Sequence, residues 1–257
     1  MEKTKKHFLR RAALLLAMLT LASAVMVGCG GKKEPEQDPK DDEVIVKPEP
    51  VVLPEGVSFD EKKYPDVFGF MQVPNASQCA ISKGHYLAQS PKSAKSETGY
   101  DDDYYLNRDL DGVTNKAGSL YIQAHYNKSD LSDPVAVIYG HNMKDNSMFG
   151  SLMYYVSEDF YKQHKLISFD TIYEKQTYEI VAAIKTELVP EGSDGFKYYE
   201  YTGSGDENSF NDYVKFIEEN RLYDTDAELS PGDKILTLST CAYHAEDGRF
   251  IVVAKKI

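Results

Sequence analysis

A chain of 257 residues, with 42% hydrophobic and 27% charged side chains, is long enough for one large globular domain or two small ones. Its formal net charge of −12 argues against a nucleic-acid-binding protein, because such proteins need a basic face. The sequence has no glycine-rich phosphate loop of the Walker type and no Cys/His cluster at zinc spacing. The cysteines Cys29, Cys79 and Cys241 lie far apart, which disfavours a disulfide framework.

Residues 1–28 have the pattern of an export signal. Met1 to Arg11 carries five basic side chains, and Ala12 to Val27 is uncharged and largely apolar. The uncharged run extends to Gly31 and spans 20 residues, so an uncleaved transmembrane anchor is one interpretation. The preferred interpretation is a lipoprotein signal. Met26-Val-Gly-Cys29 resembles a lipobox, although Met26 stands where leucine is usual, and Cys29 would be lipidated after cleavage.

A tether is predicted after the export signal. The segment from Gly30 to Gly56 contains five of the eleven prolines and many acidic side chains. Such a composition cannot bury enough apolar surface to fold, so an extended, solvated spacer is expected. The predicted organisation is therefore an export signal at residues 1–28, a tether at 29–56 and a folded domain at 57–257. Both interpretations of the signal place this domain outside the cell and attached to the membrane.

The folded domain contains many short β-prone runs. The strand candidates are Val67–Val73, Cys79–Ser82, Tyr86–Gln89, Leu120–His125, Pro134–Tyr139, Leu166–Asp170, Thr177–Leu188, Lys234–Thr240 and Arg249–Lys255. Helical patterns are few. Asp206–Asn220 has apolar residues at helical spacing and an acidic first turn, while Asp102–Asn107 and Met148–Lys165 can hold short helices. Many strands with few helices favour a closed or nearly closed β-barrel.

The run DKILTLSTC, from Asp233 to Cys241, carries the first chemical signal. Strand side chains alternate between two faces, so Leu236 and Leu238 suit a core while Cys241 ends the strand on the more polar, open face. A polar loop follows, and the next strand begins at Arg249. In a hairpin centred on Ala245, Cys241 and Arg249 lie opposite each other. A guanidinium beside a thiol favours the thiolate.

A histidine joins this pair from an earlier strand. The apolar run from Val135 to Gly140 ends at His141, and a histidine at a strand end is more easily exposed to a cleft than one within the strand. A lone cysteine is usually a small buried hydrophobe. Together, however, Cys241, His141 and Arg249 can supply the nucleophile, the proton carrier and the oxyanion or carbonyl donor that amide exchange requires.

Other residues compete for supporting roles. His244 is close to Cys241 in sequence, but its acidic, glycine-containing loop predicts a solvated side chain. His125 could line a groove, and Asp145 is near enough in sequence to be considered as the acid that orients His141. The hydroxyls of Ser239 and Thr240 could tune the thiol by hydrogen bonding.

Three blocks of residues occur in a characteristic order. They are Tyr139–Phe149 (YGHNMKDNSMF), Leu238–Cys241 (LSTC) and Arg249–Val253 (RFIVV). Tyr104–Asp109 followed by Lys116–Tyr121 adds to the pattern. Together these residues resemble the sortases, and the class B sortases in particular, over a match that runs from about residue 66 to residue 257.

The resemblance implies a mostly β fold. The expected architecture is the closed eight-stranded sortase barrel with a few helices. One long helix, at Asp206–Asn220, would precede the strand that carries Cys241. The domain at residues 57–257 would then be the catalytic domain.

The resemblance also implies an activity, that of a membrane-tethered, extracytoplasmic cysteine transpeptidase. Such enzymes cleave a C-terminal sorting motif of a secreted protein after its threonine and hold the acyl group as a thioester. An amine of peptidoglycan or of its lipid-linked precursor then takes the acyl group. Class B members often prefer an Asn-Pro-x-Thr-Asn-like motif. The implied catalytic residues are His141, Cys241 and Arg249.

The expected location and partners follow from the same resemblance. The protein would lie on the extracytoplasmic face of the cell membrane in a Gram-positive-type envelope, attached through its N-terminus. Its partners would be secreted proteins with sorting signals and the cell-wall amine, and no nucleic acid. No metal or organic cofactor is implied.

Two alternatives remain open. A cell-wall cysteine peptidase or hydrolase of the papain or NlpC type places its cysteine before its histidine, whereas His141 precedes Cys241 by 100 residues. A non-catalytic sortase-like binding lipoprotein would be marked by the loss of one of the three residues His141, Cys241 and Arg249, and all three are present.

The lipobox predicts a modification that mass measurement can detect. A mature chain that begins at Cys29 and carries lipid is the expected product in intact-mass analysis of the membrane-extracted protein. A mature chain that still contains residues 1–28 would instead establish a transmembrane anchor.

Overall fold

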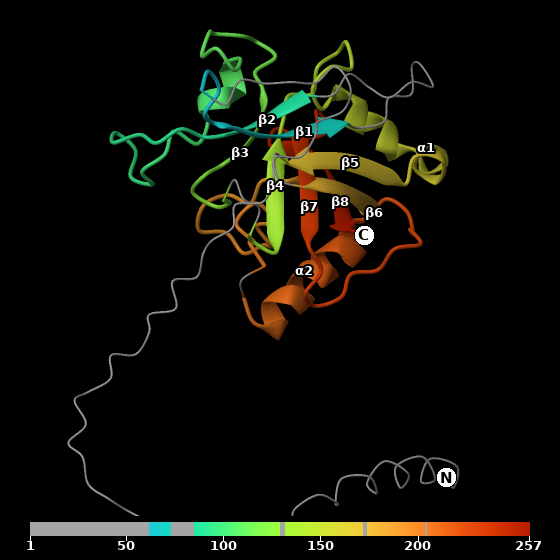
Figure 1. The fold of residues 1–257 in the computed structure, drawn as a ribbon. Helices are drawn as coiled ribbons and strands as arrows, with labels where there is room; N and C mark the ends of the chain where they lie inside the picture. The colour runs from blue at the N-terminus through green and yellow to red at the C-terminus, as the bar shows by residue number, and fades with distance from the viewer. Residues whose placement is uncertain (1–61, 73–84, 129–131, 172–173, 204) are drawn as a thin grey trace, which may run out of the picture. The chain divides into compact units, whose positions relative to one another are not determined.

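The computed structural model describes residues 62–72, 85–128, 132–171, 174–203 and 205–257 (Figure 1). Within this part of the chain the strands form one closed barrel in the order β1-β2-β3-β4-β7-β8-β6-β5. The expected mostly β, eight-stranded barrel is therefore confirmed. The predicted export signal and tether, with Cys29, lie outside the described residues, as do Cys79 and the predicted strand at 79–82.

The strands and helices have the following bounds. The strands are β1 (Val67–Gln72), β2 (His85–Gln89), β3 (Leu120–Ile122), β4 (Val135–Tyr139), β5 (Leu166–Thr171), β6 (Lys175–Glu187), β7 (Ile235–Cys241) and β8 (Gly248–Lys256). The helices are the 3-10 turns η1 (Tyr104–Asn107) and η2 (Gly150–Val156) and the α-helices α1 (Glu158–Gln163) and α2 (Glu207–Asn220).

Two predicted elements differ from those observed. The strand expected at Leu120–His125 ends at Ile122, because the backbone N–H groups of Tyr126 and Asn127 both turn back to donate to the carbonyl of Gln123. The helical region expected at Met148–Lys165 is two helices, η2 and α1. They separate at Ser157, whose backbone is extended and whose hydroxyl accepts from the N–H of Phe160 as the N-cap of α1.

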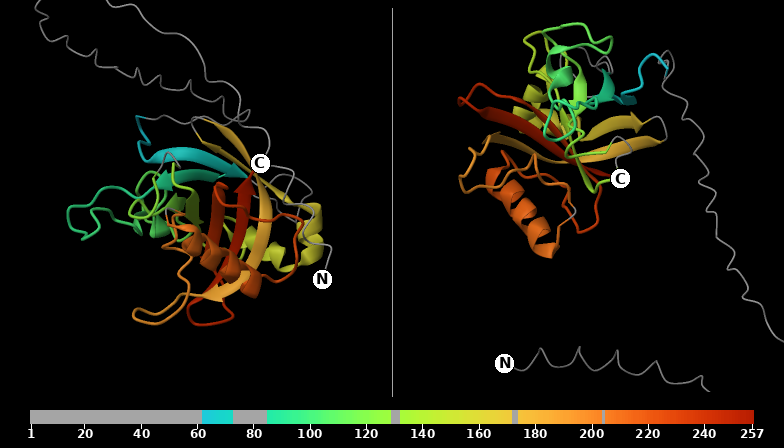
Figure 2. Two further views of the ribbon diagram at one scale, coloured as in Figure 1. Left: turned by 90° about the horizontal axis from the view of Figure 1, so that it is seen from below. Right: turned by 90° about the vertical axis from the view of Figure 1, so that its left-hand side faces the viewer.

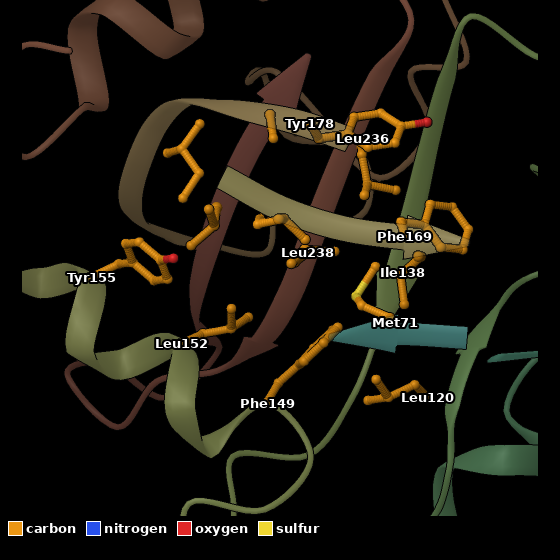
Figure 3. Packing of buried hydrophobic residues seen from close by; sticks show 14 of the residues in the cluster. Met71, Leu120, Ile138, Phe149, Leu152, Tyr155, Phe169, Tyr178, Leu236 and Leu238 are labelled. Atoms are coloured by element: carbon orange, nitrogen blue, oxygen red, sulfur yellow. The ribbon is translucent and has the colours of Figure 1, made fainter. Parts of the chain in front are cut away.

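The barrel interior is filled by one face of each strand. Ile138 of β4, Leu236 and Leu238 of β7, and Met71 of β1 are fully buried together in one cluster (Figure 3). Phe149 and residues of η2 extend the same cluster. The leucines of the DKILTLSTC run thus occupy the core, as their alternation predicts.

The opposite face of β4, β7 and β8 is buried as well. Alternate residues of these strands, such as Val137, Ile235 and Val253, form a second cluster with Tyr213 and Phe216 of α2. Strands that are covered on both faces read as nearly continuous apolar runs, which is the pattern of β4 and β8. These three strands are therefore buried on both faces.

Helix α2 supplies much of that cover (Figure 2). It begins after Asp206, whose carboxylate accepts from the N–H of Ser209 at 3.0 Å, and its buried side is formed by Tyr213, Phe216 and Ile217. An acidic N-cap also complements the helix dipole. The prediction of one long helix before the Cys-bearing strand is confirmed. In the described part of the chain, none of the helices has the length and apolarity needed to cross a membrane.

Candidate functional site

The candidate site lies at one edge of the barrel, where the adjacent strands β4 and β7 end and β8 begins (Figure 1). β4 and β7 run parallel, with Tyr139 opposite Ser239. The N–H of Gly140 donates to the carbonyl of Ser239 at 3.2 Å, which carries the pairing past the end of β4. Because parallel strands end at the same edge of a sheet, His141 and Cys241 leave the barrel side by side.

The β7–β8 hairpin brings the third residue to the same edge. Cys241 is paired with Arg249, as the sequence predicts for a hairpin centred on Ala245. The N–H of Ala242 donates to the carbonyl of Gly248 at 2.9 Å. This bond makes Cys241 and Arg249 a non-hydrogen-bonded pair, the position where facing side chains lie closest. The free thiol of Cys241 is partly exposed.

Tyrosine hydroxyls cover the polar face of β7 up to the cysteine. The hydroxyls of Thr237 and Tyr213 are 3.2 Å apart, and those of Ser239 and Tyr198 are 2.8 Å apart. Thr237 and Ser239 are buried, whereas Cys241, the next residue on this face, is partly exposed. The thiol is thus the first polar group of this face that solvent or a substrate can reach.

Two buried tyrosines, Tyr198 and Tyr121, lie within electrostatic range of Cys241. Burial raises the pKa of Tyr198 to about 12, and the hydrogen bond with Ser239 and the charge of Arg249 oppose the rise. Burial also raises the pKa of Tyr121 well above its ordinary value, and the Asp103 carboxylate reinforces the rise. Both tyrosines therefore stay neutral near pH 7.

The imidazole of His141 is held by a backbone carbonyl. Its Nε2 lies 2.7 Å from the carbonyl oxygen of Leu106 in η1. A carbonyl oxygen only accepts, so Nε2 carries the proton and Nδ1 is left as the nitrogen for proton exchange. The Leu106 carbonyl thereby has the orienting role for which Asp145 was considered.

Asp145 itself is engaged in its own turn. Its carboxylate accepts from the N–H of Ser147 at 3.0 Å and from the hydroxyl of Ser147 at 2.6 Å. These two bonds lower the pKa of Asp145, and its side chain is exposed. Asp145 thus shapes the loop after His141, and its hydrogen bonds with Ser147 give it no role in orienting the imidazole.

Two side chains join the ends of β4 and β7. The amide Nδ2 of Asn142 donates to the carbonyl of Cys241 at 2.8 Å, and the hydroxyl of Thr240 donates to the carbonyl of Gly140 at 2.7 Å. Hydrogen bonds of this kind each stabilise by about 1 kcal/mol. Sequence reasoning gave Asn142 no role. Its position directly after His141, at the end of an apolar strand, was the available signal.

The hydroxyl groups next to the cysteine serve the scaffold. Thr240 is bonded to the carbonyl of Gly140, and Ser239 is bonded to Tyr198. The idea that they tune the thiol by direct hydrogen bonds therefore receives no support from their contacts.

The two rival histidines lie outside this arrangement. His244 is exposed in the β7–β8 loop, as the sequence predicts. His125 is exposed in the turn after β3, where its ring packs edge-on against Tyr126 with ring centroids 4.6 Å apart. Across the described ranges, no group of three or more His, Cys, Asp or Glu side chains is arranged to hold a metal ion.

The arrangement has the parts of an acyl-transfer site. Cys241 offers a nucleophile, His141 a proton carrier with a fixed tautomer, and Arg249 a planar set of donors. The Nη1 group of Arg249 donates to the carbonyl of Gly248 at 3.0 Å, which anchors one nitrogen of the guanidinium. Anchoring limits the reorganisation that a charge-stabilising group would otherwise undergo during reaction.

Comparison with protein families gives a match over most of the barrel. A family model described as the sortase domain matches residues 110–257. Sortase B of Listeria monocytogenes is 32% identical over 159 residues, which is 61% of this chain and 61% of that protein. Sortase B of Staphylococcus aureus is 32% identical over 158 residues, or 60% of each chain. The match thus spans about three-fifths of the length of these relatives.

Solved structures agree with the architecture. A crystal structure of Staphylococcus aureus sortase B is 28% identical, with a TM-score of 0.62 over 77% of this chain and 84% of that one. A sortase B–substrate complex from the same organism is 26% identical, with a TM-score of 0.61 over 77% and 82%. Sortase B of Bacillus anthracis is 28% identical, with a TM-score of 0.59 over 77% and 81%.

The positions of the histidines lead to a paired prediction. His141→Ala is expected to lower peptide-cleaving turnover by about 10²–10⁴-fold, the usual contribution of general acid–base catalysis, because the leaving amine then departs unprotonated. His244→Ala, whose side chain lies in the solvent-exposed loop, is expected to retain most activity. Steady-state cleavage of a sorting peptide by both variants provides the measurement. A dead His244→Ala variant beside an active His141→Ala variant would reverse the assignment of the proton carrier.

Proposed function

The chain belongs to the sortase family, and we propose that it acts as a membrane-tethered, extracytoplasmic cysteine transpeptidase. In this proposal it cleaves a C-terminal sorting motif of a secreted protein after the threonine. It then transfers the acyl group to an amine of peptidoglycan or of its lipid-linked precursor.

One observation carries the proposal. Cys241 and Arg249 form a close cross-strand pair, and His141 follows the parallel strand β4 that is paired with β7. These are the residues through which the sequence resembles sortases. They also supply the three functions that exchange of one amide for another requires, with all three held at the same edge of the barrel.

The first half of the reaction forms a thioester. The thiolate of Cys241 attacks the carbonyl carbon of the threonine, and the negative charge that develops on the carbonyl oxygen is stabilised by N–H groups of Arg249. When the tetrahedral intermediate collapses, the C–N bond breaks. The protonated imidazole of His141 gives its Nδ1 proton to the departing amine, so that the amine leaves neutral.

The second half reverses these roles. The acceptor amine attacks the thioester carbonyl, and Nδ1 of His141 takes the proton that the amine loses. The C–S bond breaks, and Cys241 returns as a thiolate. The imidazole ends each cycle protonated, as it began. The protons and electrons of the proposed reaction therefore balance without a metal, a redox group or an external base.

The proposed location rests on the N-terminal sequence. The basic residues up to Arg11, the apolar run after them and the lipobox-like segment ending at Cys29 support attachment to the outer side of the membrane. The Pro-rich, acidic tether then gives the catalytic domain reach above the membrane surface. A Gram-positive-type envelope, with accessible peptidoglycan amines, is the setting that fits this arrangement.

The test of the proposed activity uses the full chain extracted in detergent. It is incubated with a panel of sorting peptides, including an Asn-Pro-x-Thr-Asn-like sequence, with and without amine acceptors, and the products are identified by mass. We expect cleavage after threonine, a thioester on the protein and an amine-linked product. Cys241→Ala is the matched control and should give none of the three.

Other outcomes of this assay favour the alternatives. Hydrolysis that persists unchanged at every acceptor concentration would identify a cysteine peptidase. Peptide binding without a thioester or cleavage would identify a non-catalytic binding lipoprotein.

Arg249 allows charge to be separated from geometry. Arg249→Lys keeps the positive charge but loses the planar fork. If Arg249 holds the carbonyl oxygen, the Lys variant should be nearly as inactive as Arg249→Ala, with turnover lowered by about 10²–10³-fold, the usual cost of one lost oxyanion donor. Alkylation of Cys241 by iodoacetamide should then change little in either variant.

An active Arg249→Lys variant beside an inactive Arg249→Ala variant would assign Arg249 a different role. If Arg249 mainly favours the thiolate, Lys should restore much of the activity, and alkylation should slow only in the Ala variant. Full peptide cleavage by Arg249→Ala would remove Arg249 from the proposed site.

A further inference from the structure

The ring of His141 is held by a hydrogen bond to a backbone carbonyl of another segment of the chain. Among the described residues, the hydrogen-bond partner of the ring is the carbonyl oxygen of Leu106, 2.7 Å from Nε2. Leu106 belongs to η1, a 3-10 turn of four residues whose position therefore sets the position of the imidazole. What fixes η1 also fixes His141.

The segment that leads into β3 holds η1 in place. The N–H of Ser119 donates to the carbonyl of Tyr105 at 2.9 Å, and the Ser119 hydroxyl donates to the carbonyl of Arg108 at 3.1 Å. The N–H of Asn115 donates to the carbonyl of Asn107 at 3.0 Å. The residues from 115 to 119 thus form a clasp around η1, with hydrogen bonds at both ends of the turn.

Gly118 stands at the centre of this clasp and is buried against the carbonyl that binds His141. A Cβ added at Gly118 would lie 2.3 Å from the oxygen of Leu106 and 2.7 Å from that of Tyr105, whereas ordinary contacts begin near 3.4 Å. Its φ of +58° is also in the left-handed region, which favours glycine. Only a residue without a side chain lets the clasp close on η1 in this way.

We propose that Gly118 is a positioning residue for the transpeptidation proposed above, and that it acts on His141 through the carbonyl of Leu106. A methyl group at residue 118 must push this carbonyl aside by about 1 Å. Hydrogen bonds from N–H to oxygen weaken beyond about 3.2 Å, so the bond to Nε2 is lost or misdirected. The imidazole then keeps its chemistry but loses its fixed direction and its hydrogen-bond acceptor.

The kinetic test compares two glycine substitutions in the full chain. Gly118→Ala is expected to lower kcat by about 10–100-fold with KM within about twofold, because a small misplacement of a catalytic group acts mainly on the chemical step. Gly232→Ala is the matched control. Gly232 also has a positive φ, +94°, but a Cβ there would meet no atom within 4 Å, so near-normal turnover is expected.

A spectroscopic test does not depend on turnover. In protein labelled with ¹⁵N-histidine, the hydrogen-bonded Nε2–H of His141 should give a protected ring N–H signal, which His141→Gln assigns by its loss. We expect this signal to disappear or exchange rapidly in Gly118→Ala and to persist in Gly232→Ala. A wild-type chain that is inactive on every sorting peptide would refute the proposed function, while this measurement would still decide whether Gly118 positions the ring.

A milder variant covers the case in which Gly118→Ala does not fold. Ser119→Ala removes one hydrogen bond of the clasp without adding an atom, and it should lower kcat several-fold while the ring N–H signal exchanges faster. The proposal is overturned if Gly118→Ala folds with wild-type kcat and an intact ring signal, or if Ser119→Ala leaves both unchanged when Gly118→Ala cannot be obtained.

Discussion

The parallel pairing of β4 with β7 is the constraint on which the site depends. Its register sets Tyr139 beside Ser239, and the chain reaches His141 and Cys241 two residues later on both strands. Parallel pairing requires a long crossover, and here the connection from β4 to β7 contains β5, β6 and α2. The histidine and the cysteine are thus brought together across 100 residues of chain, and a slip by one residue would turn one of them to the other face.

Local patterns were enough to predict much of this arrangement. Alternation of Leu236 and Leu238 with polar residues fixed the face of Cys241, and the length of the polar loop placed Arg249 opposite it. Helix α2 was visible in its apolar spacing and acidic cap. Each of these features depends on residues that are close in sequence. The spacing of apolar residues and the length of the loop are therefore sufficient to predict them.

Two unpredicted parts of the site depend on a backbone group or on a distant contact. A carbonyl such as that of Leu106 is present in every residue, so the sequence gives no sign of which one will orient His141. Asn142 is bonded to the carbonyl of a residue 99 positions away, and no local period reports such a contact. Asp145 was considered only because it is near His141 in sequence, and its carboxylate accepts instead from the hydroxyl of Ser147.

Hydrogen bonds from two side chains explain how His141 and Cys241 can lie at strand ends while the backbone there stays ordered. Strand ends fray because their outermost carbonyls lack ladder partners, and a buried polar group without a partner costs about 1–3 kcal/mol. Here Thr240 and Asn142 donate to two such carbonyls, those of Gly140 and Cys241. These two hydrogen bonds therefore hold the backbone in place beyond the last hydrogen bonds between the strands. The thiol and the imidazole can therefore remain open to a substrate while the backbone that bears them stays fixed.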